Sequence, residues 1–246
     1  MPRQTPTGET RIIFFDVVET VFSLAPLKEE MTGFNLPAGT DRLFFAQLLR
    51  DAFALSAAGV FHSFPEIAKG TLAVLLDSLG HKASDTVLKK ILEAFSQLPA
   101  HEDVKPALEK LKPSDYQAVL LTNGSRANTE KLVRDNGIEH LVDDIVSVED
   151  FNIWKPQAAL YQAAARRHSC DPGNALLIAA HAWDVHGAIR AGLHGIWVQR
   201  QESIYHPLMG KPDEQVANLV DAVDLALSRL QGTRAAEQNQ PTPRGG

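Results

Sequence analysis

Short runs of consecutive apolar residues alternate along this chain with longer segments that repeat apolar residues at helical spacing. The short runs are RIIFF (11–15), AVLLT (118–122), DIVSV (144–148), ALLIAA (175–180) and GIWV (195–198). Because these runs are apolar throughout rather than at every second position, they predict strands that are covered on both faces. Helices are predicted between them, at about 103–112, 125–136, 157–168 and 184–191. Strands that alternate with helices indicate an α/β fold with a parallel sheet.

Residues 23–97 interrupt this alternation. The segments DRLFFAQLLRDAFAL, FPEIAKGTLAVLLDSL and SDTVLKKILEAF repeat apolar residues at helical spacing, and no strand pattern separates them. The pattern predicts a helical domain at 23–97, inserted after the first strand of a core domain made of residues 1–22 and 98–232. The last segment, 233–246, is polar and contains Gln, Pro and Gly, so it predicts a disordered tail.

The composition narrows the class of protein. Of the 246 residues, 44% are hydrophobic and 22% are charged, as in an ordinary globular protein, and the net charge is −6. This charge argues against binding to nucleic acid or to an anionic membrane, since both need clustered Lys and Arg. No apolar run approaches the ~20 residues of a membrane span, and the polar start of the chain lacks a secretory signal. Cys170 is the single cysteine, so no intrachain disulfide can form. We expect a cytoplasmic protein.

Polar side chains lie at or just beyond the ends of four predicted strands. In chain order they are Asp16, Thr122, Asn123, Lys155, His181 and Asp184. Ligands of an open parallel sheet bind at the carboxyl ends of its strands. Taken singly, each residue also has a structural explanation, such as a capping Asp, a solvated Lys or a core His. Their occurrence at successive strand ends favours one catalytic site.

At these positions the chain resembles a known family. The segments FFDVVETVF, LLTNGS, WKPQAALY and AAHAWDVHGA are similar to the four motifs of the haloacid dehalogenase-like (HAD) superfamily, and more closely to those of its type II, L-2-haloacid dehalogenase members. The spacing also agrees, since Thr20 lies four residues after Asp16 and Tyr161 lies six after Lys155. The resemblance spans residues 11–200. It implies a Rossmann-like parallel-sheet core with an inserted helical cap.

The resemblance implies nucleophilic catalysis by a carboxylate. Asp16 would displace a leaving group from carbon and form an aspartyl ester, which water would then hydrolyse. Lys155 would keep the pKa of Asp16 low and fix its direction. Asp184 would pair with Lys155 or orient the water. Hydrogen bonds near the nucleophile would come from Thr20, Thr122, Asn123 and Tyr161, although an aromatic core residue is an equal alternative for Tyr161.

The chain departs from the phosphatases of the superfamily. These usually have an aspartate general acid at the position of Val18, and a magnesium-binding aspartate at the position of Ala180. One carboxylate fewer weakens a Mg²⁺ site, so metal-dependent phosphoryl transfer is disfavoured. His181 and His186 are five residues apart and no Cys or carboxylate cluster joins them, so a zinc site is not expected either. No metal and no cofactor are predicted.

The chain also departs from the dehalogenases of the family. These usually have Tyr at Val18, Gly at Glu19, and Ser and Asn at Ala179 and His181. We hypothesise that His181 is the general base for ester hydrolysis, because the pKa of an unperturbed imidazole, ~6.5, suits that task. If Glu19 faces the site, it favours a neutral or cationic substrate. The alternatives are that Glu19 faces solvent or accepts hydrogen bonds from turn amides, or that another cap residue restores the missing positive charge; the sequence does not decide between these.

The family's cap arginine, which steadies the halide and the substrate, has no clear equivalent. By alignment its place falls near Phe45, and the nearest arginine is Arg50. Arg50 either reaches the site from a shifted helix register or is an exposed arginine. The segments FFAQLL and GVFHSF are predicted to line the cap face, and the substrate contacts are predicted to be Val18, Glu19, Phe45, Arg50, Tyr161 and Trp183.

The sequence therefore predicts a hydrolase that uses Asp16 to remove halide from a small 2-haloacid without a metal. A HAD phosphatase acting on a small phosphate ester and a catalytically silent HAD-like binding protein are the alternatives. The predicted partner is a small-molecule substrate, with no nucleic acid and no membrane. Type II relatives are often dimers, so a homodimer stays open.

Overall fold

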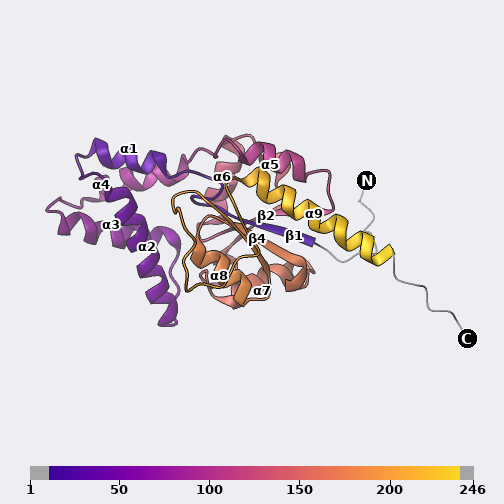
Figure 1. Ribbon diagram of the computed structural model, residues 1–246. Helices are drawn as coiled ribbons and strands as arrows, with labels where there is room; N and C mark the ends of the chain where they lie inside the picture. The colour runs from indigo at the N-terminus through magenta and orange to yellow at the C-terminus, as the bar shows by residue number, and fades with distance from the viewer. Residues whose placement is uncertain (1–10, 239–246) are drawn as a thin grey trace, which may run out of the picture.

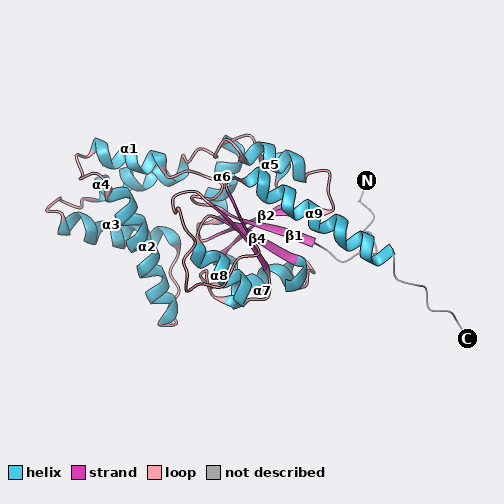
Figure 2. Ribbon diagram, viewed as in Figure 1, coloured by secondary structure: helices cyan, strands magenta, loops and turns pink. Residues whose placement is uncertain are grey.

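In the computed structural model, which describes residues 11–238, six strands form one parallel sheet in the order β3-β2-β1-β4-β5-β6 (Figures 1 and 2). Their bounds are β1 Arg11–Asp16, β2 Tyr116–Thr122, β3 Asp144–Ser147, β4 Ala175–Ala179, β5 His194–Val198 and β6 Glu214–Val216. The predicted α/β class and the five predicted strands are confirmed. The edge strand β6 was not predicted, because its three residues are exposed or partly exposed and form no apolar run.

Helices occupy both faces of the sheet and one side of the molecule. Their bounds are α1 Ala25–Gly33, α2 Thr40–Ala57, α3 Phe64–Ser78, α4 Asp85–Glu93, α5 Val104–Leu111, α6 Arg126–Asp135, α7 Ala158–Arg167, α8 Ala182–Arg190 and α9 Leu219–Gln238. The four helices predicted between the strands correspond to α5, α6, α7 and α8. Helices α1 to α4, here called the cap helices, follow β1 directly and lie to one side of the sheet (Figure 1).

Alternate residues of the central strand β1 point into two separate apolar cores. Ile13 and Phe15 belong to the core shared with α5, α6, α9 and the cap helices, whereas Ile12 and Phe14 belong to the core under α7 and α8. All four side chains have at most 1% exposure. The sheet is therefore covered on both faces, as its apolar strands predicted.

The strand order changes direction at β1. Strand β1 pairs with β2 on one side and with β4 on the other, so the loops after these strands diverge from a common edge. Such a switch point is the usual ligand site of an open α/β sheet. Asp16, the last residue of β1, stands at this point.

The carboxyl-terminal part of the chain differs from the expectation. Helix α9 runs to Gln238, so residues 233–238, which were expected in the disordered tail, are helical, and residues 239–246 lie outside the described range. The prediction of a tail rested on the polar composition of residues 233–246, but residues 233–238 continue helix α9, which begins at Leu219. Between residues 11 and 238, no helix is both long enough and apolar enough to cross a bilayer.

Candidate active site

At the switch point, buried side chains from four segments are joined by a row of hydrogen bonds. Lys155 Nζ donates to Asp16 Oδ1 at 2.9 Å and to Asp184 Oδ2 at 2.8 Å. Tyr161, from α7, donates its hydroxyl to Asp184 Oδ1 at 2.5 Å. Lys155, Asp184 and Tyr161 have no exposed surface, while Asp16 keeps 5%. The nucleophile predicted from the sequence is therefore the one member of this row that solvent reaches.

Thr20 fixes the second oxygen of Asp16. Its hydroxyl donates to Asp16 Oδ2 at 2.6 Å and accepts a hydrogen bond from the backbone N–H of Ala180 at 2.8 Å. The loop after β1 is thereby tied to the end of β4. Arg200 adds a second tie, because its guanidinium donates to the backbone carbonyl of Thr20 at 3.1 Å and to Asp103 at 2.8 Å.

The charges set the protonation of the site. Burial acts to raise the pKa of Asp16, but the Lys155 ammonium, His181 and the hydrogen bonds outweigh it and lower this pKa below the ordinary aspartate value. Burial raises the pKa of Asp184, and the attraction of Lys155 offsets this only in part. For Lys155, burial acts to lower the pKa, but its two carboxylate partners raise it above the ordinary lysine value. Asp16 is thus held ionised beside a permanent cation.

The loop after β2 meets the loop that carries Lys155. Asn123 Oδ1 accepts a hydrogen bond from the backbone N–H of Lys155 at 3.3 Å. The hydroxyl of Thr122 accepts from the backbone N–H of Gly124 at 2.9 Å, and Ser147 Oγ donates to the Gly124 carbonyl at 2.7 Å. Thr122 and Asn123 therefore order this edge, and the described hydrogen bonds connect neither side chain directly to Asp16.

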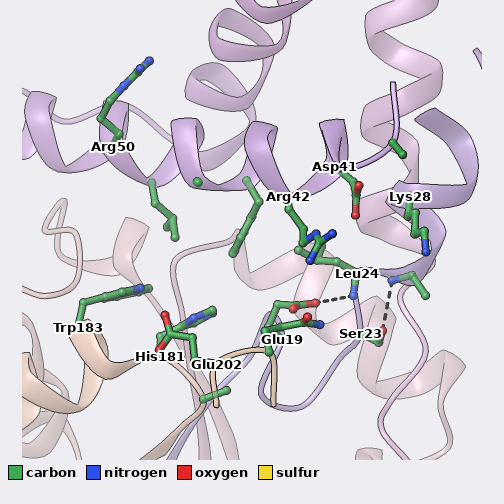
Figure 3. Close-up of a pocket in the computed structure, with 18 of the residues that line it drawn as sticks. Glu19, Ser23, Leu24, Lys28, Asp41, Arg42, Arg50, His181, Trp183 and Glu202 are labelled. Atoms are coloured by element: carbon green, nitrogen blue, oxygen red, sulfur yellow. Dashed lines mark hydrogen bonds between the residues drawn. The ribbon is translucent and has the colours of Figure 1, made fainter. Parts of the chain in front are cut away.

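A cavity of about 830 Å³ lies between the cap helices and the end of the sheet (Figure 3). Four of the predicted substrate contacts line it, namely Glu19, Phe45, Arg50 and Trp183, together with the predicted base His181. A smaller apolar cavity of about 170 Å³ lies beside the β1 exit and is lined by Val18, Phe64 and Thr122, among others. The predicted contact Tyr161 lines neither, because it is buried behind Asp184.

The carboxylate of Glu19 binds a turn amide, which is one of the arrangements considered from the sequence. Its Oε1 accepts a hydrogen bond from the backbone N–H of Leu24 at 2.9 Å. Its side chain also lines the larger cavity, and only 6% of the residue is exposed. The backbone of Glu19 is left-handed, with φ of 68°, a conformation that glycine adopts without strain. This agrees with the glycine that the resembled dehalogenases have at this position.

Two arginines of α2 line the larger cavity with different orientations. Figure 3 shows Arg42 directed toward Glu19 and Arg50 pointing away from it. Arg50 binds Asp51 at 2.7 Å, whereas Arg42 has no ion-pair partner within residues 11–238. Arg42 was not singled out from the sequence. A usable signal existed, because Arg42 lies one helical turn before Phe45 and therefore on the same face of α2.

His181, which acts electrostatically on Asp16, carries a buried nitrogen with no hydrogen-bond partner among the described residues. Its ring stacks on Trp183 with centroids 5.2 Å apart and an interplanar angle of 14°. Its Nε2 is buried and has no hydrogen-bond partner within the described part of the chain. A buried nitrogen with no partner is unfavourable unless water or substrate binds it.

The donor set does not fit Mg²⁺, the metal that the superfamily's phosphatases use. Lys155 Nζ binds both Asp16 and Asp184, so one oxygen of each carboxylate is already paired with an ammonium. Val18 and Ala180 contribute no side-chain oxygen. Mg²⁺ demands an octahedron of oxygen ligands, which these residues do not supply.

The fold and site define a class of α/β proteins in which a buried, cation-paired aspartate ends the first strand beneath a helical cap. A family model described as "Haloacid dehalogenase-like hydrolase" matches residues 66–198, more than half of the chain, and the chain belongs to this family.

Relatives of known activity and known structure align with this chain along most of their length. The (S)-2-haloacid dehalogenase of Pseudomonas fluorescens is 26% identical over 219 residues, which cover 88% of this chain and 96% of that protein. Among solved structures, the L-2-haloacid dehalogenase of Xanthobacter autotrophicus with chloropropionic acid covalently bound superposes with a TM-score of 0.79 at 20% identity, covering 89% of this chain and 98% of the other. The L-2-haloacid dehalogenase RSc1362 gives a TM-score of 0.82 at 19% identity, covering 89% and 100%. At these identities the structural likeness concerns the fold.

Proposed function

We propose that this protein removes halide from 2-halo carboxylates by hydrolysis, through an ester formed on Asp16. The observation that carries the proposal is the clamp on Asp16: Lys155 at 2.9 Å on one oxygen and Thr20 at 2.6 Å on the other. A carboxylate held in this way is ionised and aimed, as a nucleophile must be. The dehalogenase names of the relatives that span most of the chain support the same chemistry.

In the first step an Asp16 carboxylate oxygen attacks C2 of the substrate from the side opposite the halogen. The new C–O bond forms as the carbon–halogen bond breaks, and the halide leaves with the bonding electron pair. The configuration at C2 inverts. Arg42 would bind the substrate carboxylate, because it lines the cavity beside Glu19 and no ion pair within residues 11–238 occupies it.

In the second step water attacks the carbonyl carbon of the Asp16 ester. His181 would accept a proton from this water through its free Nε2 and return it to the departing alkoxide of the product. The 2-hydroxy acid leaves with an oxygen that came from Asp16, and Asp16 regains an oxygen from water. One halide and one proton are released for each water consumed.

The same site gives less support to the alternatives. Phosphoryl transfer by the superfamily's metal-dependent route needs oxygen ligands that Val18 and Ala180 lack. A cation between two carboxylates is costly to bury, and this cost counts against a catalytically silent protein.

The proposal is tested by halide release from (S)-2-chloropropanoate without added metal. Wild-type protein is expected to release halide, and Asp16→Asn to release none. Asp41→Asn, which changes another carboxylate of the same cavity, is the matched control and is expected to keep its activity. A single turnover in ¹⁸O-labelled water should place the label in Asp16 and leave the first product unlabelled. Label found in the first product, or activity that survives in Asp16→Asn, would contradict the ester mechanism.

The role of His181 has a separate test. His181→Ala should release one equivalent of halide in a rapid burst and then turn over about 10²–10⁴ times more slowly, because the ester accumulates. Intact-protein mass spectrometry would detect the ester on Asp16. If the burst is absent and the steady rate is unchanged, His181 is not the base.

A further inference from the structure

The larger cavity has more volume than a three-carbon haloacid would fill. Its volume of about 830 Å³ falls within the range of about 300–1,000 Å³ that is typical of pockets for drug-sized ligands. Small residues contribute to this room, since Ala38, Gly39, Ala46 and Ala180 all line the wall. The cavity can therefore hold a substituent much larger than a methyl group.

One wall of this cavity is a continuous row of aromatic rings. Phe53 contacts Trp183 edge to face at 5.1 Å, Trp183 stacks on His181 at 5.2 Å, and His181 lies 6.0 Å from Phe45. All four side chains are partly exposed and all four line the cavity. Aromatic residues that only fill a core have no solvent-exposed surface, whereas these four side chains are partly exposed. The row therefore presents ring surface to a ligand.

The charges around the cavity do not favour a second charged group on the ligand. The three cations of the lining, Lys28, Arg42 and Arg50, are balanced by three carboxylates, Glu19, Asp41 and Glu202. One cation, Arg42, is directed toward Glu19, as Figure 3 shows. A ligand with one carboxylate beside Arg42 and a neutral, flat group along the aromatic wall matches this distribution.

We propose that the aromatic row binds the ring of an aryl-bearing substrate, a 3-aryl-2-halopropanoate, while its C2 faces Asp16. This inference rests on the proposed function and specifies its substrate class. The ring would pack between α2 of the cap helices, which supplies Phe45 and Phe53, and the start of α8, which supplies Trp183. The cap helices would thus select for the side chain of the substrate through Phe45 and Phe53, in addition to binding its acid group through Arg42.

The test compares (S)-2-chloropropanoate with (S)-2-chloro-3-phenylpropanoate, which differ only by a phenyl group on C3. We expect kcat/KM to be about tenfold higher for the phenyl substrate, because a well-placed aromatic contact adds ring stacking to burial. The 3-cyclohexyl analogue serves as a control for size, and it should fall below the phenyl substrate. Non-enzymatic halide release is subtracted for each compound.

The variant Phe53→Ala is expected to lower kcat/KM for the phenyl substrate about tenfold and to change that for 2-chloropropanoate less than twofold. Leu43→Ala, an exposed position of the same helix that does not line the cavity, should change neither. The inference is overturned if wild type prefers 2-chloropropanoate, or if Phe53→Ala affects both substrates equally. Release from neither compound by folded wild-type protein would instead refute the proposed function.

Discussion

At the scale of single residues, Lys155 is an unusual group to bury completely. Its ammonium has no exposed surface, and transfer of an isolated charge from water to a protein interior costs several kcal/mol or more. Asp16 and Asp184 offset this cost from two sides. Two carboxylates and one ammonium carry a net charge of one negative unit, and Asp16 is the member of this group that solvent reaches.

The protonation states of Asp16 and Lys155 predict how the rate of ester formation depends on pH. The pKa of Asp16 is lowered below an ordinary value of about 3.9, and that of Lys155 is raised above about 10.4. Asp16 therefore stays ionised and Lys155 stays protonated from about pH 5 to about pH 9. The rate of the single-turnover halide burst should be constant over this range. A titration of the burst inside this window would show that another group controls the first step.

Arg42 gives the second prediction at this scale. Its replacement by Met should raise KM for 2-chloropropanoate at least about tenfold, since an ionic hydrogen bond contributes about 1.5–3 kcal/mol. Arg50→Met is the matched control on the same helix, and it should change KM less than twofold because Arg50 is bound to Asp51 and points away. Steady-state halide release measures both. A larger effect at Arg50 would restore the assignment first considered from the sequence.

The contrast between these arginines shows what sequence could and could not predict at the site. Asp16, Lys155, Asp184 and Tyr161 occur in motifs, and the structure joins them in one hydrogen-bonded chain. Arg42 belongs to no motif. Its position beside Glu19 depends on how α2 packs over the sheet, which apolar spacing alone does not specify.

At the scale of elements, α8 packs very closely against the loop that carries Lys155. A Cβ atom on Gly187 would lie 2.6 Å from Pro156 Cβ, 2.7 Å from the Pro156 carbonyl oxygen and 2.8 Å from the Tyr161 hydroxyl. These distances are shorter than van der Waals contact. Only glycine lets α8 pack this close to the loop.

Gly187→Ala should therefore move the loop that carries Lys155. We expect it to lower the free energy of unfolding by about 1–3 kcal/mol, as overpacking does, and to reduce halide release more than tenfold. Gly70→Ala in α3 is the control, because nothing lies within 4 Å of its added Cβ and alanine favours helix. Urea denaturation measures both. Equal effects of the two substitutions would remove the packing explanation.

The sequence predicted elements well where burial is continuous. The five long strands have apolar runs, and the four helices between them have clear boundaries. Strand β6 and helix α1 escaped prediction because their patterns are short, with one and four intermediate or buried residues, respectively, among exposed ones. Such elements form because neighbouring structure supports them.

At the scale of the whole molecule, two hydrogen bonds join the Lys155 loop to the cap helices. Trp154, which is 1% exposed, donates its indole N–H to the His62 carbonyl at 2.9 Å and stacks on Phe64. Gln157 donates to Ser56 Oγ at 2.5 Å. The residues on either side of Lys155 and Pro156 thus hold the cap helices against the sheet.

Trp154→Phe keeps an aromatic ring against Phe64 and removes the indole donor. We expect faster amide hydrogen exchange in residues 56–64 and a several-fold lower kcat/KM, since one hydrogen bond contributes about 0.5–1.5 kcal/mol. Gln157→Ala, which removes the second bond, should act in the same direction. Unchanged exchange in both variants would show that apolar packing alone closes the cap.

The hydrogen bonds around the nucleophile close very large loops. Asp16 and Lys155 are 139 residues apart, Thr20 and Ala180 are 160 apart, and Thr20 and Arg200 are 180 apart. Chain entropy opposes the formation of such distant contacts, which makes them slow to form during folding. The reactive centre is thus completed only when nearly the whole chain is in place. A polypeptide still emerging from the ribosome would carry Asp16 from the outset, but the groups that clamp it would reach it only after Lys155, Ala180 and Arg200 had been made and folded into place.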